Sequence, residues 1–273
     1  MCFSGFCFTI TGHYCKLLYN YASLFATSMK TKWETRVYID LFSGAGRAKI
    51  IETSNIVKSS PLISLSINDP FDYYIFCEQN SELISALHDR VNRDYSCAKV
   101  SFIEGNSNVI VEKILESLPA FNKERKMLTF CFVDPFKLDN MKFATIMQLA
   151  ERFMDFLILL PTGMDATRNM ESTYVDSKSI ILDEYFGTAE WRENYEHYKR
   201  QGKSIALFLT DFFAEQMQRN GYIYKGADKT VLIRSKEKNL PLYRLILFSR
   251  HELGYQFWQE TKKYSDSQLD LAF

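Results

Sequence analysis

The chain has 273 residues, a length that fits one large domain or two small ones. Hydrophobic residues make up 47% of it and charged residues 24%, with only 11 Gly and 6 Pro, so collagen-like, low-complexity and disordered proteins are excluded. The 33 basic and 33 acidic residues cancel, and no net charge directs the whole protein to nucleic acid or to a membrane surface.

No stretch reaches the roughly 20 apolar residues that cross a bilayer. The apolar residues 1–10 lack the basic flank of a signal peptide. The six cysteines form no C-x-x-C pair and no cluster with the four histidines, so neither a metal site nor a disulfide framework is predicted. We therefore expect a cytoplasmic protein that holds no metal and has no membrane partner.

The first part of the chain alternates between amphipathic segments and short apolar runs. Helical spacing predicts a helix over residues 13–29, ahead of a strand at 37–42 and a polar loop. Ser60 and Ser81 are the expected caps of the next two helices. Further strands are predicted at residues 73–78, 99–104, 127–133 and 156–160, with helices at 109–118 and 143–153 between the later ones.

The alternation breaks over residues 162–202, which we interpret as an insertion that acts as a lid or recognition element. Ser204 begins a long helix, and runs at 230–234 and 243–249 predict an antiparallel hairpin before a last helix at 251–263. The pattern predicts one α/β domain over residues 1–273. Its fold class is a doubly wound, Rossmann-like, seven-stranded, mostly parallel sheet with an antiparallel terminal hairpin.

Ligands of doubly wound sheets bind at the carboxyl ends of the strands, so the residues after each strand are candidate site residues. The run from Asp40 to Gly46 follows the first strand, and its glycines permit a tight turn and close approach to a ligand. Glu78 ends the second strand and could bind ribose hydroxyls, or it could be an ordinary exposed glutamate. Asn106 follows the third strand and could meet an adenine edge, unless Ser107 or Asn108 simply caps a helix.

Asp134, Pro135 and Phe136 follow the fourth strand. The order of glycine turn, acid, polar loop and Asp-Pro-Phe resembles the class I S-adenosylmethionine-dependent methyltransferases. That resemblance implies a fold of this class and S-adenosylmethionine as the cofactor, held by Asp40, Phe42, Gly44, Gly46, Glu78 and Asn106. It also implies that Asp134, Pro135 and Phe136 are the catalytic residues, which receive a target nitrogen. The second proline of the family's motif is absent here, and the competing interpretation is an ordinary loop with a core phenylalanine.

A closer resemblance extends over nearly the whole chain and is to the three-Cys-motif partner protein family, TcmP. It is carried by residues 38–47, 60–63, 132–136, 160–161, 168–169 and 247–251, with Gly254, Phe257 and Trp258. The family is named for its association with a companion protein that bears a three-cysteine motif. The resemblance therefore implies such a companion as a partner.

Two functions from different classes remain open. One is methyl transfer to an exocyclic or side-chain nitrogen of a nucleic acid or a protein. The other is a non-catalytic, methyltransferase-like scaffold that binds the companion protein. An NAD-linked dehydrogenase is a weaker alternative, because Lys49 stands where the last glycine of G-x-G-x-x-G belongs.

The carboxyl-terminal third is locally basic, with 13 basic and 6 acidic residues between Lys199 and Lys263. Such an excess is compatible with RNA or DNA as a partner and also with charges on solvated helix faces. The candidate phosphate contacts are Arg219, Lys225, Lys229, Arg234, Lys236 and Lys238. Arg47, beside the glycine turn, is a further candidate contact for a carboxylate or phosphate.

Overall fold

The computed structural model describes residues 12–49, 55–120, 126–176, 178–226, 229–234 and 239–265. The described chain forms two compact units, one of residues 12–132 with 256–265 and the other of residues 133–255. The single domain expected from the sequence therefore stays a prediction, and each unit is described by itself below.

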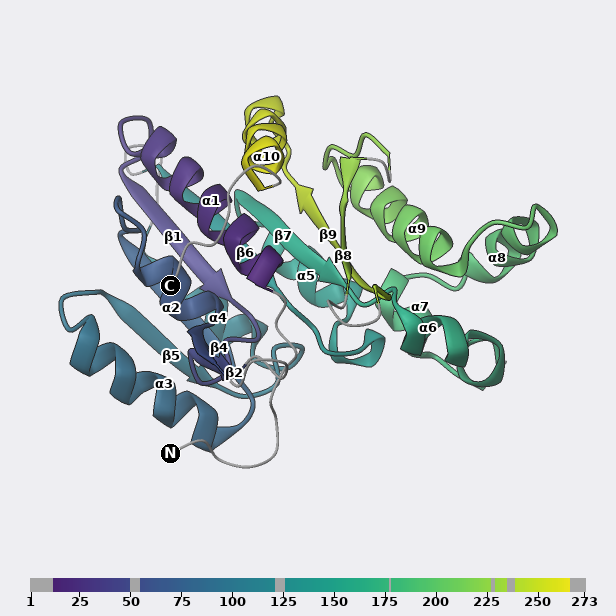
Figure 1. The fold of residues 1–273 in the computed structure, drawn as a ribbon, viewed down its shortest axis with the longest axis horizontal. Helices are drawn as coiled ribbons and strands as arrows, with labels where there is room; N and C mark the ends of the chain where they lie inside the picture. Colours follow the sequence, from purple (N-terminus) through teal and green to yellow (C-terminus); the bar gives the residue numbers. More distant parts are fainter. Residues whose placement is uncertain are drawn as a thin grey trace. The chain divides into compact units, whose positions relative to one another are not determined.

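The first unit begins with a helix and then alternates between strands and helices (Figure 1). Its elements are α1 (Gly12–Met29), β1 (Thr35–Asp40), β2 (Arg47–Lys49), β3 (Ile56–Lys58), α2 (Ser60–Leu65), β4 (Tyr73–Glu78), α3 (Ser81–Asp94), β5 (Val100–Glu104), α4 (Val111–Glu116) and β6 (Met127–Val133). The chain returns to this unit within α10 (Glu252–Ser265).

The second unit carries the segment that the sequence marks as an insertion, and that segment is helical. Its elements are η1 (Leu138–Asn140), α5 (Phe143–Ala150), β7 (Met154–Leu160), α6 (Met164–Asn169), η2 (Met170–Tyr174), α7 (Ile181–Phe186), α8 (Trp191–Arg200), α9 (Ile205–Arg219), β8 (Val231–Arg234) and β9 (Pro241–Phe248). Within the described ranges, no helix has the length and apolar character needed to cross a membrane.

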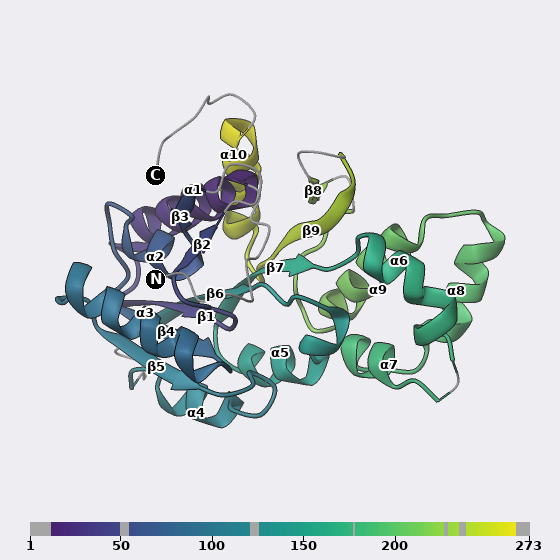
Figure 2. The same cartoon turned by 60° about the horizontal axis from the view of Figure 1, so that its bottom comes forward.

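The main sheet has seven strands in the order β5-β4-β1-β6-β7-β9-β8 (Figure 2). β1 is parallel to its neighbours β4 and β6, and β4 is parallel to β5. β9 is antiparallel to both β7 and β8. This topology confirms the predicted fold class. The chain moves from β1 to β4 and β5 and then returns to β6 on the other side of β1, which puts the topological switch point at the carboxyl ends of β1 and β6.

Several local predictions need correction. The polar loop predicted after the glycine turn contains a short antiparallel ladder between β2 and β3. Asn80, and not Ser81, caps α3, because its side-chain oxygen accepts hydrogen bonds from the backbone nitrogens of Glu82 at 3.0 Å and Leu83 at 3.1 Å. The N-cap of α2 is likewise one residue earlier than predicted, at Ser59. The strand predicted at residues 37–42 ends at Asp40, because the chain turns there.

Aromatic side chains fill the interior of each unit. In the first unit, Phe130 of β6 packs against Tyr21, Phe25 and Tyr38, with ring centroids 5.1 to 5.6 Å apart. In the second unit, Phe186 of α7 lies 4.8 Å from Phe212 of α9 in an edge-to-face arrangement. The helices of residues 162–202 thus share a core with α9. Their role as a lid or recognition element stays a prediction.

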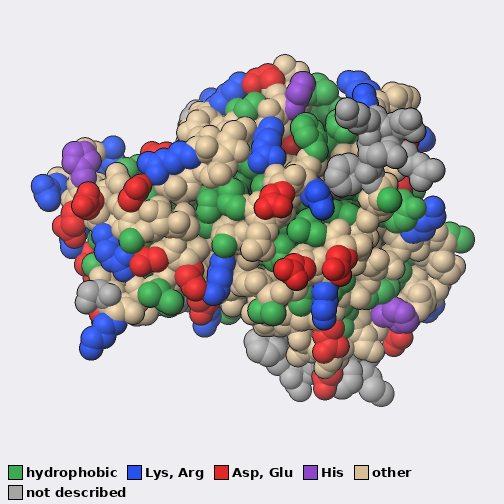
Figure 3. Space-filling view, turned by 180° about the vertical axis from the view of Figure 1, so that it is seen from behind, with side chains coloured by type: hydrophobic (Ala, Val, Ile, Leu, Met, Phe, Trp, Pro, Cys, Tyr) green, Lys and Arg blue, Asp and Glu red, His purple; other side chains and the backbone are tan. Residues whose placement is uncertain are grey.

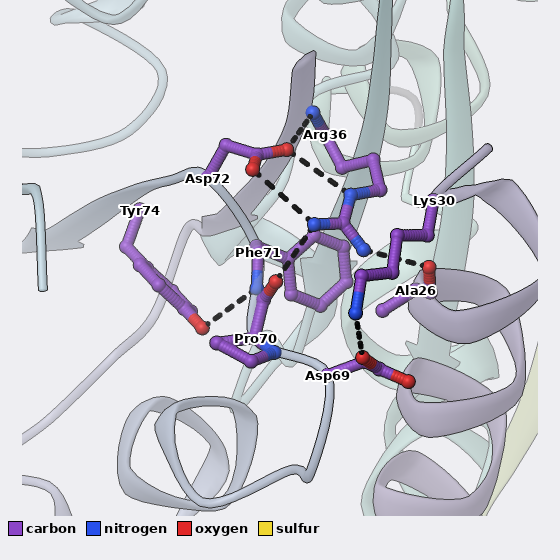
Figure 4. A network of polar contacts seen from close by, with 8 residues as sticks. All are labelled: Ala26, Lys30, Arg36, Asp69, Pro70, Phe71, Asp72 and Tyr74. Atoms are coloured by element: carbon purple, nitrogen blue, oxygen red, sulfur yellow. Dashed lines mark hydrogen bonds and ion pairs between the residues drawn. The ribbon is translucent and has the colours of Figure 1, made fainter. Parts of the chain in front are cut away.

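A buried guanidinium joins three segments at the amino-terminal end of β1 (Figure 4). Arg36 donates from Nε and Nη2 to the two carboxylate oxygens of Asp72, at 3.0 and 3.2 Å. It also donates from Nη1 to the carbonyl of Ala26 at 2.8 Å and from Nη2 to that of Pro70 at 3.1 Å. Because Ala26 belongs to α1 and Asp72 precedes β4, the side chain fixes both elements to the start of β1.

A buried carboxyl group lies in the second unit. Asp155 of β7 is 7% exposed. Burial raises its pKa to about 7, although a hydrogen bond with Ser249 and the charge of Arg250 act in the opposite direction. A Cβ atom at Gly254 would lie 2.5 Å from Ser249 Oγ and 3.1 Å from Asp155 Oδ2, so only glycine leaves room for this contact.

The raised pKa of Asp155 predicts a pH dependence of stability. A carboxyl whose pKa is higher in the folded than in the unfolded state binds a proton on folding, so its contribution is most favourable below pH 4 and is lost as the pH rises to about 7. Asp155→Asn should therefore raise the free energy of unfolding at pH 8 by on the order of 4 kcal/mol, and by little at pH 4. Urea denaturation at the two pH values measures this, and an equal effect at both would contradict it.

Candidate functional site

The turn after β1 has two residues in the left-handed backbone region. Gly44 has φ +58° and Gly46 has φ +78°. A Cβ atom at Gly44 would meet no described atom within 4 Å. At Gly46 it would lie 2.7 Å from Leu87 Cδ1 and 2.9 Å from Leu62 Cγ. Gly44 thus leaves open space over the backbone, whereas Gly46 is required for packing against α2 and α3.

Glu78, at the end of β4, holds this turn directly. Its Oε2 accepts a hydrogen bond from the backbone nitrogen of Gly44 at 3.0 Å. Its Oε1 accepts one from the backbone nitrogen of Asn80 at 2.9 Å. A carboxylate can accept about four hydrogen bonds, so these two leave acceptor capacity for hydroxyl groups of a ligand. The predicted pair of Gly44 and Glu78 is therefore brought into contact.

Three further contacts fix the turn. Ser43 donates from its backbone nitrogen to the carbonyl of Cys77 at 2.9 Å. Arg90 of α3 donates from Nη1 to the carbonyl of Ala45 at 2.6 Å. The backbone nitrogen of Ser59 donates to the carbonyl of Gly46 at 2.9 Å. Sequence reasoning missed Arg90 and Ser59 because both contacts come from elements distant in the chain.

Asp40 and Phe42 flank the start of the turn. Asp40 is fully buried, and its Oδ1 accepts a hydrogen bond from the backbone nitrogen of Phe42 at 3.2 Å. The hydroxyl of Tyr38 donates to Oδ2 of Asp40 at 3.5 Å. Burial, followed by the charge of Asp40, raises the pKa of Tyr38 well above its usual value. Asp40 therefore shapes the turn from below, and Phe42 is half-buried beside it.

The loop after β5 is tied to the end of β4. The backbone nitrogen of Gly105 donates to the carbonyl of Glu78 at 3.0 Å. Asn106 is exposed, and its Oδ1 accepts a hydrogen bond from the backbone nitrogen of Asn108 at 2.9 Å. The N-cap of α4 is Ile110, so the alternative that Ser107 or Asn108 caps the helix is wrong.

The Asp-Pro-Phe segment directly follows β6 and begins the second unit. Asp134 is half-buried, Pro135 is buried and Phe136 is 52% exposed. Lys137 Nζ lies 5.9 Å from the centroid of the Phe136 ring. The exposure of this ring excludes the competing interpretation of a core phenylalanine. An exposed aromatic ring next to a carboxylate can stack on a flat group and accept its N–H hydrogen bonds.

Metal and thiol chemistry find no support in the described residues. They include no group of three or more His, Cys, Asp or Glu side chains that could hold a metal ion. Cys77 and Cys131 are fully buried, and burial raises the pKa of both thiols well above the usual value. Neither is a reactive thiolate at neutral pH.

Charges of both signs are interspersed on the face shown in Figure 3, and neither sign covers a broad continuous area. The basic carboxyl-terminal third is in part internally paired. Arg219 Nη1 lies 3.0 Å from Glu190 Oε2, and Lys225 forms an ion pair with Glu252. Arg234 donates to the carbonyl of Asn239, while Lys236 and Lys238 lie outside the described residues. This region as a nucleic-acid contact stays a prediction.

No family model matches the chain, and no curated protein matches it. Among solved structures, protein LPL1258 of Legionella pneumophila is 11% identical with a TM-score of 0.50, covering 94% of this chain and 95% of its own. The O-methyltransferase TomG of Streptomyces achromogenes, in complex with SAM, is 10% identical with a TM-score of 0.48, covering 89% and 82%. An O-methyltransferase of Bacillus cereus in complex with SAH is 8% identical with a TM-score of 0.49, covering 88% and 82%. At these identities the likeness to the Legionella protein shows the fold alone.

The two glycines of the turn predict different costs of substitution. Gly44→Ala introduces left-handed strain but no collision, and should lower the free energy of unfolding by about 1 kcal/mol. Gly46→Ala adds a collision with Leu62 and Leu87 and should cost about 3 kcal/mol. Urea denaturation of both variants distinguishes the sites. Equal costs would show that the packing around Gly46 relaxes without penalty.

Proposed function

We propose that this protein binds S-adenosylmethionine over the glycine turn and transfers the methyl group to a nitrogen atom. The observation that carries the proposal is the contact of Glu78 with Gly44 at the carboxyl ends of two adjoining strands, β4 and β1. Ligands of doubly wound sheets bind at this end of the sheet, beside the switch point. The order of motifs along the sequence supports the same class of cofactor.

The residues of the turn fit such a cofactor. Gly44 presents backbone with open space where a side chain would stand, so a ligand can approach it closely. Glu78 retains acceptor capacity for two ribose hydroxyls. Asn106 is exposed in the neighbouring loop and would meet the adenine edge. Asp40 and Phe42 would shape the turn beneath the methionine part.

The acceptor end of the reaction is assigned to Asp134, Pro135 and Phe136. The bound cofactor would supply an electrophilic methyl group on a positively charged sulfur, which needs little acid–base assistance. Asp134 would accept a hydrogen bond from an amine N–H and so orient the nitrogen lone pair, while Phe136 would stack on the flat acceptor group. Pro135 is buried and restricts the backbone between them. Catalysis by these residues is mainly positioning.

The resemblance to TcmP supports a companion protein with a three-cysteine motif as a partner. The missing second proline of the Asp-Pro-Phe motif favours a second candidate function, a scaffold that binds the companion without catalysis. The two functions differ in one measurable property. An enzyme binds the cofactor and transfers its methyl group, whereas the scaffold transfers none, with or without the companion.

The first test of the proposed function concerns Glu78. Glu78→Ala removes ribose acceptors and releases Gly44, so the affinity for S-adenosylmethionine should fall by about tenfold or more. Isothermal titration calorimetry with the cofactor and its demethylated product measures this. Glu112→Ala is the matched control, because it removes an exposed carboxylate from α4 and leaves the turn intact. Unchanged affinity in Glu78→Ala would exclude its assigned role, and a wild-type protein that binds neither compound would exclude the cofactor.

The second test concerns Asp134. Asp134→Ala should leave cofactor affinity unchanged and reduce methyl transfer by about 100-fold, because the acceptor nitrogen loses its orientation. Transfer of a labelled methyl group to total cellular RNA and protein, with the companion present, measures the activity. Asp139→Ala, which removes an exposed carboxylate from η1, is the control. Full activity in Asp134→Ala would exclude this motif as the acceptor site.

A further inference from the structure

The hairpin of β2 and β3 begins directly after the glycine turn. Arg47, the first residue of β2, follows Gly46, and the backbone nitrogen of Ser59 closes the base of the hairpin on the carbonyl of Gly46 at 2.9 Å. β3 packs beside α2. Any group on this hairpin is thus held at the carboxyl end of β1, where the proposed cofactor site lies.

The register of the hairpin places like charges opposite each other. Arg47 pairs with Lys58, Ala48 with Val57, and Lys49 with Ile56. Directly opposite residues of an antiparallel pair project to the same face, and residues two apart share that face as well. One face therefore carries Arg47, Lys58 and Lys49 together with Ile56, which is 50% exposed.

This arrangement is unfavourable for an isolated hairpin. Like charges directly opposite each other destabilise a strand pair, and a ladder of three residues per strand has little stability to lose. Arg47 is exposed and Lys58 half-buried, so the two cations face the surface at close quarters. An anionic ligand that neutralises both would remove this repulsion.

The surroundings add positive charge. Arg90 reaches the carbonyl of Ala45 from α3. Asp94 is the acidic group nearest to the hairpin, and its hydrogen bond to Arg93 chiefly lowers its pKa, with smaller contributions from Arg47 and Lys58. Its two carboxylate oxygens are already bound by Arg93 Nε at 2.8 Å and Nη2 at 2.9 Å. Asp94 therefore does not neutralise the cations of the hairpin.

We propose that the face of the β2–β3 hairpin formed by Arg47, Lys49 and Lys58 binds the phosphodiester backbone of a nucleic-acid substrate. Cations spaced along a strand match the repeated phosphates of a polynucleotide better than a single small anion. The exposed side chain of Ile56 offers an apolar contact to a base or sugar beside them. The inference rests on the proposed function in one respect, since it makes the methylated molecule a nucleic acid.

The decisive variant is Lys58→Glu. The introduced carboxylate would stand opposite Arg47 and pair with it, so the hairpin should become no less stable while its positive charge disappears. Affinity for a short single-stranded RNA should fall roughly fivefold to tenfold at about 50 mM salt, and the slope of log affinity against log salt should decrease by about 0.7. Fluorescence anisotropy from about 50 to about 200 mM salt measures both.

Lys32→Glu is the matched control, because it makes the same change of net charge at an exposed residue just before the amino-terminal end of β1. Its affinity should stay close to that of the wild type. Equal losses in Lys32→Glu and Lys58→Glu would overturn the assignment to the hairpin, as would a wild-type protein that binds no RNA or DNA at low salt. Equally tight binding of an acidic polypeptide would also overturn it.

The same experiments separate the two proposals. Hairpin-dependent RNA binding by a protein that fails to bind S-adenosylmethionine would remove the proposed methyl transfer and leave the nucleic-acid surface in place. Cofactor binding with hairpin-independent RNA binding would do the reverse. Arg47→Glu, read alongside Lys58→Glu, repeats the test from the opposite strand.

Discussion

The buried guanidinium of Arg36 is the interaction on which the first unit depends. Removing a guanidinium from water is costly, and here bonds to Asp72, Ala26 and Pro70 compensate for the lost hydration. Because these partners lie on α1 and on the loop before β4, the helix and the strand are fixed to β1 before any side chain of the site is placed. The register of β1 with β4, which aligns Asp40 with Phe76, then sets where the glycine turn and Glu78 meet.

Strands buried on both faces are what the sequence predicts best. The runs at residues 73–78 and 127–133 are continuous apolar segments, and the structure forms strands over the same residues. The strand order was also predictable, because consecutive strand–helix units leave few topologies. Helix ends were less predictable: Asn80 and Ser81 are both suitable caps, and only the side-chain geometry selects Asn80.

The site was predictable in its residues and only in part in its contacts. The glycines and Glu78 follow from the rule that ligands bind at strand ends. The bond from Arg90 to Ala45 spans 45 positions and depends on how α3 lies against the turn, which no local pattern encodes. The β2–β3 ladder escaped prediction for another reason, since its strands have three residues each and carry little hydrophobic signal.

The fixed glycine turn has a consequence for turnover. Glu78, Arg90 and Ser59 hold its backbone through bonds made within the protein, so a ligand would meet a finished surface and lose little freedom in the chain on binding. S-adenosylmethionine and its demethylated product share the ribose and adenine that such a surface would hold. An enzyme built in this way retains its spent cofactor about as tightly as the fresh one, so product inhibition would govern its steady-state rate.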